Sequence, residues 1–301
     1  MKRPAIIWFC SIMAAAPAAF AHANATTAVT LQSVKTIKQK AAAGDPQAQA
    51  ELGLAYQHGR GVPRDYDKAR QWDERAAKQG NAAGEYQLGN IYFHGFGVKR
   101  DYSKAFHYYT ASSHQHNSAA ESQLGYMYQI GIGVSKNYKE AAKLFERSSA
   151  QGNSSAANNL GQIYLHGEGV PVNTKLALHW FKISAAADNV GGLNDLGSMY
   201  QNGQEVRKNV TKAFQLYKKA AELGGEGGMN NLAVLYFNGN GVPYDPEKSA
   251  FYLFSAVKLA SQFNKAAPEH NLKVVSSILS KHKLALAKEK SNEWLRRHKF
   301  N

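Results

Sequence analysis

A short segment ending in Gly-x-Gly-Val or a close variant recurs six times in this chain, each time 36 residues after the previous copy. The copies read YQHGRGV from residue 56, YFHGFGV from 92, YQIGIGV from 128, YLHGEGV from 164, YQNGQEV from 200 and YFNGNGV from 236. A glycine loop that cradles a phosphate is needed once, whereas a structural turn is needed in every repeat. The constant spacing therefore predicts six copies of one structural unit with this turn near its centre.

The first copy, residues 45–80, carries the signals of two helices. Asp45-Pro46 predicts a helix start, because aspartate caps free amides and proline fits the first turn. Gly59 predicts the end of that helix, since glycine takes the left-handed conformation without steric cost. A second helix is expected after Asp65, and the same capping position in the later copies holds Asp101, Asn137, Asn173, Asn209 and Asp245.

A single helix pair of this kind cannot bury its own apolar face, but stacked pairs share a continuous core. The sequence therefore predicts an all-α fold, a right-handed α-solenoid of six 36-residue helix-turn-helix repeats with helical caps. We expect residues 26–44 to form an N-terminal capping helix and residues 261–301 a basic C-terminal capping helix. The predicted repeats span residues 45–80, 81–116, 117–152, 153–188, 189–224 and 225–260.

An Ala-x-x-x-Leu-Gly-x-x-Tyr helix, an Asp or Asn cap and an alanine-rich second helix recur together with the turn. In these features residues 45–260 resemble the Sel-one-like repeat family, a relative of the tetratricopeptide repeat. The resemblance implies a non-catalytic scaffold that binds other proteins. Exported bacterial members are adaptors, envelope regulators and host-interaction factors, so the resemblance implies a role of this kind without naming a partner.

Two positions depart from the repeat pattern. Glu205 stands where the other turns have their second glycine, and a positive φ there would cost about 1–2 kcal/mol, so we expect a locally altered or more mobile turn. Asp73 stands where the other second helices carry an aromatic residue or leucine. We therefore expect the second helix of the first repeat to be more exposed than its counterparts.

The chain begins with MKRPAIIWFCSIMAAAPAAFAHANA, a basic start followed by an apolar run and small residues, which is typical of a secretory signal peptide. Residues 1–25 are the predicted leader, with cleavage after Ala21, Ala23 or Ala25. Cys10 follows bulky Phe9 in mid-run and is a poor lipid-attachment site, so no lipid anchor is predicted. No other apolar run approaches the length of a membrane span. A periplasmic or secreted protein without cysteine is the resulting prediction.

The formal net charge of +14 would fall to +12 with the loss of Lys2 and Arg3, and much of the excess lies near the C-terminus. Residues 270–301 carry only Glu289 and Glu293 as acidic groups. Their basic groups are Lys273, Lys281, Lys283, Lys288, Lys290, Arg296, Arg297 and Lys299. This charge indicates an acidic polymer or anionic surface as an alternative partner, or simply a solvated basic helix. Nucleic acid is not expected as a partner of an exported protein.

The first helices of such pairs normally line the concave face of a solenoid, and we expect a protein or extended peptide to bind there. An amide offers both a donor and an acceptor, so a ladder of amides can hold a peptide backbone, and tyrosines add apolar contact. The alternative is that these amides only cap neighbouring turns. The predicted partner-binding residues are Tyr86, Gln87, Asn90, Ser122, Gln123, Tyr126, Asn158, Asn159, Gln162, Asn194, Asp195, Asn230 and Asn231.

No catalytic, metal or cofactor site is predicted. His58, His94 and His166 share one column at helix ends, and the group His107, His114 and His116 lacks an acidic or cysteine partner at ligand spacing. Some cysteine-rich relatives have been linked to β-lactam hydrolysis, and Ser-x-x-Lys occurs at residues 255–258 and 280–283. The companion Ser-Asp-Asn and Lys-Thr-Gly motifs and those cysteines are absent, so a β-lactam-binding hydrolase is the least favoured alternative.

Overall fold

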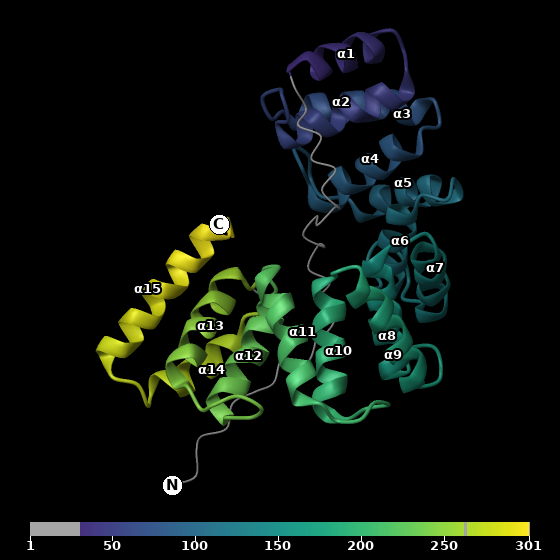
Figure 1. Ribbon diagram of the computed structural model, residues 1–301. Helices are drawn as coiled ribbons and strands as arrows, with labels where there is room; N and C mark the ends of the chain where they lie inside the picture. The colour runs from purple at the N-terminus through teal and green to yellow at the C-terminus, as the bar shows by residue number, and fades with distance from the viewer. Residues whose placement is uncertain (1–30, 262–263, 301) are drawn as a thin grey trace. The chain divides into compact units, whose positions relative to one another are not determined.

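The structure, a computed structural model, describes residues 31–261 and 264–300. The predicted signal peptide lies outside the described residues. These residues form fifteen helices and no strand (Figure 1). The helices are α1 Leu31–Ala42, α2 Pro46–His58, α3 Tyr66–Lys78, α4 Ala82–His94, α5 Tyr102–His114, α6 Ser118–Ile130, α7 Tyr138–Ala150, α8 Ser154–His166, α9 Thr174–Ala186, α10 Val190–Asn202, α11 Val210–Glu222, α12 Glu226–Asn238, α13 Pro246–Leu259, α14 Ala266–Ser276 and α15 Lys281–Arg297.

Helices α2 to α13 are the six predicted helix pairs, which confirms the all-α repeat architecture. In the first pair the Asp45 side chain caps α2, and Gly59 ends it with a φ of 68°. Asp65 caps α3 by accepting a hydrogen bond from the Lys68 amide. The predicted caps of the later second helices act in the same way, namely Asp101, Asn137, Asn173, Asn209 and Asp245. Local capping chemistry thus sets the start of each of the six second helices.

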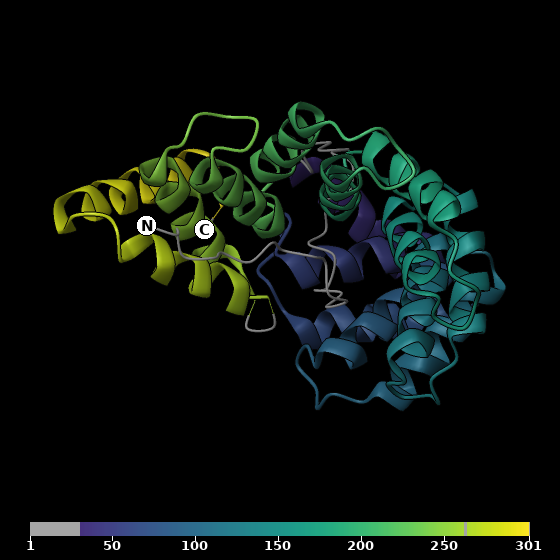
Figure 2. The same ribbon diagram turned by 90° about the horizontal axis from the view of Figure 1, so that it is seen from below.

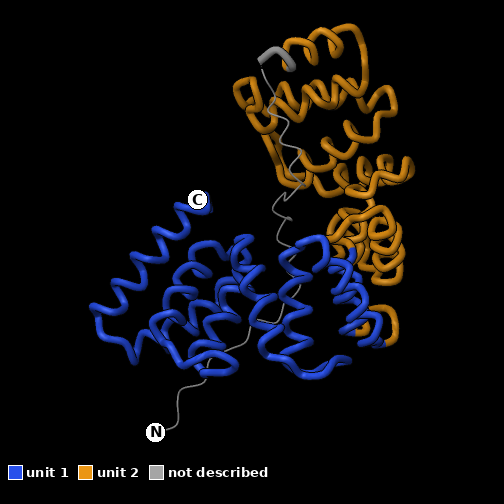
Figure 3. Tube along the Cα trace, viewed as in Figure 1, with its two compact units in different colours: residues 1–18, 157–166, 172–301 blue, residues 19–156, 167–171 orange. Residues whose placement is uncertain are grey.

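The described chain divides into two compact units (Figure 3). The N-terminal unit holds α1–α7 together with residues 167–171, and the C-terminal unit holds residues 157–166 and the chain from Val172 onward. Within each unit the two helices of a pair pack against each other, and the first helices of successive pairs also touch, as α2 does with α4 and α10 with α12 (Figure 2). Each unit is therefore a stack of helix pairs with its own core.

The core of the second to fifth pairs is built around a glycine of the first helix and an aromatic ring of the second. A Cβ atom on Gly125 would lie 2.9 Å from the Phe145 ring, and one on Gly161 would lie 2.5 Å from the Phe181 ring. The same contact joins Gly89 to Tyr109 and Gly197 to Tyr217, and all four rings are fully buried. The recurrent Leu-Gly pair therefore allows the close approach of an aromatic ring.

The prediction that Asp73 marks an exposed part of the first repeat is wrong for this residue. Its side chain is 0 % exposed and lies against Gly53, in the slot that Tyr109 or Phe145 fills in later pairs. Neither carboxylate oxygen has a hydrogen-bond partner. The stacking of α3 against α2 buries the position whatever residue it holds, because the neighbouring Ala69 and Ala76 are also fully buried.

The predicted alteration of the fifth turn is not seen in its backbone. Glu205 has a φ of 55°, in the same left-handed region as the glycines at its position in other turns, such as Gly97 at 67° and Gly241 at 72°. Its carboxylate accepts a hydrogen bond of 2.5 Å from the Thr174 hydroxyl. Other repeats have tyrosine, valine or, in the sixth, proline in the Thr174 column. A hydrogen bond to the preceding second helix thus holds Glu205 in a conformation that non-glycine residues disfavour.

The caps differ in part from the prediction. Helix α1 packs on α2, as expected of an N-terminal cap. The C-terminal segment is two helices, α14 and α15, rather than one. Serine explains the break, because the Ser277 hydroxyl donates to the Val274 carbonyl at 2.7 Å and Ser280 caps α15 through the Lys283 amide. Serine side chains that bond to nearby backbone groups compete with helix continuation.

Candidate functional site

The predicted binding residues of the N-terminal unit gather around one buried tyrosine. The Tyr109 hydroxyl donates to the Asn90 side-chain oxygen at 2.8 Å, and the ring centre of Tyr109 lies 5.9 Å from that of Tyr86. Phe93 lies between the ring of Tyr109 and that of Tyr126, with 6.3 Å between ring centres in each case. Residues from α4, α5 and α6 therefore form one aromatic cluster, defined as Tyr86, Phe93, Tyr109 and Tyr126.

The cluster is only partly covered. Tyr86 and Tyr126 are partly exposed, as is Gln123, whereas Asn90 and Gln87 are buried. Burial raises the pKa of the Tyr86 phenol, and its hydrogen bond with Asn90 opposes that shift. Gln87 donates to the Ala50 carbonyl of α2 at 3.2 Å, so it links two first helices. Tyr86, Gln123 and Tyr126 are the members of the predicted set in this unit that offer surface to a partner.

In the C-terminal unit the predicted amides form a chain of hydrogen bonds with one another. Asn271 of α14 donates to Asn230 at 2.8 Å, and Asn231 of α12 donates to Asn194 of α10 at 2.9 Å. Asn230 and Asn231 are themselves 3.5 Å apart, donor to acceptor. Gln162 of α8 donates to Asp195, and its own oxygen lies 3.0 Å from the His166 ring nitrogen. Successive first helices are thus connected by a buried polar chain.

These side chains have little left to offer a ligand. Asn230 is 0 % exposed, and Gln162, Asn194, Asp195 and Asn231 are also buried. Buried amides that are fully hydrogen-bonded stabilise a specific packing, and removing one partner leaves the other unsatisfied. The polar chain therefore fixes how the first helices stack. Asn158 and Asn159 are more open, and the buried Asn158 side-chain oxygen has no hydrogen-bond partner. Ser122 is buried in α6.

Two members of these groups were missed by the repeat pattern. Asn271 lies 41 residues after Asn230, outside the 36-residue period, so no column of the repeat contains it. Phe93 stands one residue after the recurrent tyrosine and was assigned to no surface. An aromatic residue at that position in only some repeats was the available signal.

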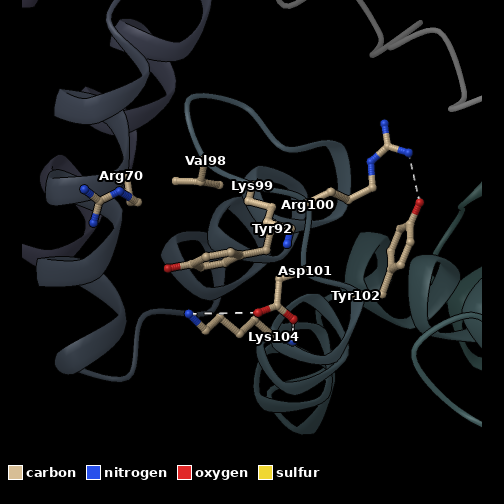
Figure 4. A pocket seen from close by; sticks show the side chains of 8 residues that line it. All are labelled: Arg70, Tyr92, Val98, Lys99, Arg100, Asp101, Tyr102 and Lys104. Atoms are coloured by element: carbon tan, nitrogen blue, oxygen red, sulfur yellow. Dashed lines mark hydrogen bonds and ion pairs between the residues drawn. The ribbon is translucent and has the colours of Figure 1, made fainter.

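A basic hollow of about 600 Å³ lies beside the second turn (Figure 4). Arg100 donates to the Tyr102 hydroxyl at 3.0 Å, and the Lys104 ammonium lies 5.0 Å from the centre of the Tyr92 ring. Its lining residues are Arg70, Tyr92, Val98, Lys99, Arg100, Asp101, Tyr102 and Lys104. Four cationic side chains against one carboxylate can attract a carboxylate or phosphate group.

The remaining candidates do not assemble into a reactive site within the described residues. No three His, Cys, Asp or Glu side chains there lie close enough to hold a metal ion, the group around His107 included. Ser255 is fully buried and hydrogen-bonded to Ser291 at 2.8 Å, while Ser280 caps α15. Burial and the neighbouring Arg100 lower the pKa of His94. None of the described helices combines the length and hydropathy needed to cross a membrane.

Repeated helix pairs with a shared glycine-aromatic core define the class of protein: a helical-repeat scaffold. The Sel1 repeat model matches residues 46–81, 82–117, 118–153, 154–189, 191–225 and 227–261. The chain belongs to the Sel1 repeat family.

The chain is similar to several solved structures. A Sel1 repeat protein from Oxalobacter formigenes is 30 % identical over 75 % of this chain and 90 % of its own, with a TM-score of 0.71. The protective antigen c5321 of uropathogenic Escherichia coli, which displays an SLR fold, is 25 % identical over 89 % of this chain and 80 % of its own, with a TM-score of 0.36. A putative Sel1 repeat protein from Klebsiella pneumoniae is 22 % identical, covering 66 % and 97 %, with a TM-score of 0.47. No curated protein matches the chain.

Proposed function

We propose that this protein is an exported, non-catalytic scaffold that binds another protein through its first-helix face. The signal-like N-terminal sequence supports export to the periplasm or beyond, and the repeat family supports a scaffold role. The observation that carries the proposal is the aromatic cluster, in which Tyr86 and Tyr126 remain partly exposed beside Gln123. Tyrosines with one open edge are favourable contact residues, because they combine apolar area with a polar group.

Accessible surface decides which of the thirteen predicted residues take part. A peptide backbone would be held in the N-terminal unit by Gln123 rather than by buried amides such as Asn90 and Gln87, and Tyr86 and Tyr126 would supply apolar contact. An envelope protein or a host protein fits this exported scaffold as the partner.

Capture from envelope extract tests the proposal, with bound proteins identified by mass spectrometry. We expect the native protein to retain a specific partner, and we expect Tyr126→Ala and Gln123→Ala to lose most of it. Tyr244→Ala is the matched control, because Tyr244 is an exposed tyrosine at a turn in the C-terminal unit. Thermal unfolding of each variant checks that folding is kept. Equal capture by all variants would contradict the proposal.

A second candidate function is the binding of an acidic polymer or an anionic surface by α15. The basic residues of this helix are exposed, and the described residues offer ion pairs only to Lys283, with Glu247 at 2.7 Å, and to Arg297, with Glu293 at 2.5 Å. Lys281, Lys288, Lys290 and Arg296 remain available for an external partner. Each such cation contributes about 1 kcal/mol near an anionic membrane surface.

Vesicle binding separates the two candidates. Vesicles rich in phosphatidylglycerol are expected to bind the protein at low salt and release it at high salt, because screening weakens exposed charges. Lys281→Glu, Lys288→Glu and Lys290→Glu together should abolish this binding, while Lys35→Glu and Lys38→Glu in α1 should change it little. Salt-resistant vesicle binding would exclude the electrostatic function.

A further inference from the structure

The outward side of α9 carries an apolar stripe. Val172 is 62 % exposed, Leu176 37 % and Ile183 39 %. Leu176 and Ile183 are seven residues apart, so they lie on the same side of the helix, and Val172 precedes them in the turn. The opposite side of α9 packs inward through residues such as Ala177 and Phe181, which are fully buried. The helix is therefore apolar on both sides, although folding requires only one.

The other repeats show that this stripe is not a requirement of the repeat. The three equivalent positions are mostly charged in the other repeats. The Val172 column holds Arg64, Arg100, Lys136, Lys208 and Tyr244; the Leu176 column holds Lys68, Lys104, Glu140, Lys212 and Lys248; the Ile183 column holds Arg75, Ala111, Arg147, Lys219 and Ser255. Only the fourth repeat has an aliphatic residue larger than alanine in any of these columns, and it has one in all three.

The central inward contact of α9 is the same as in other repeats. Phe181 fills the slot beside Gly161 as Phe145 does beside Gly125. The outward change is therefore not a compensation for altered packing within the pair. Exposed apolar side chains that are grouped and serve no packing purpose are typical of protein contact sites.

Charge indicates what kind of segment fits the stripe. Helix α9 contains no aspartate or glutamate, and the exposed Lys175 and Lys182 come one residue before Leu176 and Ile183, so they line one edge. If a second copy of the chain docked antiparallel about a two-fold axis, Lys175 and Lys182 would face the same lysines of that copy. Repulsion between these like charges opposes such a dimer. A partner with acidic residues beside its apolar row is complementary.

We propose that the outward side of α9, defined by Val172, Leu176 and Ile183, docks an amphipathic helix of another protein whose apolar row is flanked by Asp or Glu. Leu176 and Ile183 provide two anchors two helical turns apart, which match apolar residues at the same spacing on the partner. Lys175 and Lys182 pair with the acidic flank. The inference rests on the proposed scaffold function but uses a surface separate from the aromatic cluster.

The test is a displayed library of amphipathic helices whose apolar row is flanked by acidic, neutral or basic residues. The full-length protein is the target, and the Leu176→Lys, Ile183→Lys double variant is used for counter-selection. Lysine stands at both columns in the fifth repeat, as Lys212 and Lys219, so this variant is expected to fold. The control double variant, Ile278→Lys with Leu286→Lys, alters other exposed apolar residues of the same unit.

Acidic-flanked helices should be selected, and their affinity, measured by fluorescence anisotropy, should fall about tenfold or more in the Leu176→Lys, Ile183→Lys variant. The control variant and Tyr126→Ala should bind as the native protein does, so this result stands even if the aromatic cluster fails as a site. The proposal is overturned if no selected helix binds the native protein more tightly than the Leu176→Lys, Ile183→Lys variant. Preference for basic flanks overturns it too, as does a native dimer, seen by light scattering, that the variant abolishes.

Discussion

Asp73 provides a quantitative test of how the core of a pair is built. Its carboxyl group is 0 % exposed, and neither oxygen has a hydrogen-bond partner. Burial, with a smaller contribution from Glu74, raises the pKa of Asp73 well above its ordinary value. The carboxyl group is therefore neutral in the folded protein at pH values where it is ionised in the unfolded chain.

This difference makes stability depend on pH in a definite direction. Between the ordinary pKa of about 3.9 and the raised folded pKa, unfolding releases a proton. The free energy of unfolding consequently falls by about 1.4 kcal/mol per pH unit as pH rises through this range, and the fall stops above the folded pKa. With respect to Asp73, the protein is most stable at acidic pH.

Replacing Asp73 with leucine should remove this loss. Leu253 occupies the equivalent position of the sixth repeat, where Ala233 replaces the glycine, and it is fully buried. Removing an unsatisfied buried group contributes about 1–3 kcal/mol, and burying the leucine side chain contributes about 1.5–3 kcal/mol. Crowding against Gly53 costs about 1–3 kcal/mol. Asp73→Leu should thus be about 2 kcal/mol more stable than the native protein at neutral pH.

Urea denaturation between about pH 4 and pH 8 measures both effects. The native protein should lose stability with rising pH relative to Asp73→Leu. Asp67→Leu is the control, since the Asp67 side chain is 71 % exposed, and its stability curve should run parallel to that of the native protein. Parallel curves for the native protein and Asp73→Leu, or a less stable Asp73→Leu at neutral pH, would refute the reasoning.

Three further predictions concern stability and are checked by urea denaturation. Thr174→Tyr should destabilise the protein by crowding Glu205, and adding Glu205→Gly should restore stability. A double-mutant cycle should give a coupling energy of about 1–2 kcal/mol between the two positions. Additive effects would exclude an interaction between Thr174 and Glu205. Gly161→Ala should cost about 1–3 kcal/mol, because its Cβ would lie 2.5 Å from the facing ring. Asn231→Ala should cost about 1–3 kcal/mol by breaking the polar chain, whereas an unchanged midpoint would mean that the chain adds nothing.

Helix limits were predictable because their causes are local. Asp45 and Gly59 act on backbone groups within a few residues. The helix-ending glycine recurs in all six copies, whereas the sixth copy has Gly225 in the Asp45 column and no side-chain cap there. Repetition separates a structural turn from a phosphate loop, which no single copy of the turn does. The break between α14 and α15 was missed because the segment lies outside the repeats, where no second copy identifies the serine caps.

Whether a polar side chain on a first helix is buried or exposed was not predictable from the repeat spacing. Gln123 and Asn231 occupy the same column, yet Gln123 is partly exposed and Asn231 is 1 % exposed. The difference depends on what the next first helix presents to each of them. Asn231 meets Asn194 of α10, and its neighbour Asn230 meets Asn271 of the C-terminal cap. Such contacts depend on how the helices stack, and the residues aligned in one repeat column do not show this.

Some differences between repeats are compensated by a second change elsewhere in the chain, and others are not. Glu205 is matched by Thr174, which donates to its carboxylate. In each of the first three repeats a 2.8 Å hydrogen bond joins a polar residue of the first helix to a glutamine at the end of the second helix. The pairs are Gln49 with Gln79, Glu85 with Gln115 and Glu121 with Gln151. In the fourth repeat both positions are alanine, Ala157 and Ala187. Compensated changes preserve the fold. The stripe on α9 changes three outward columns, while the central inward contact of the helix, Phe181 beside Gly161, stays as in other repeats. A change without a compensating partner inside the molecule is best explained by a partner outside it.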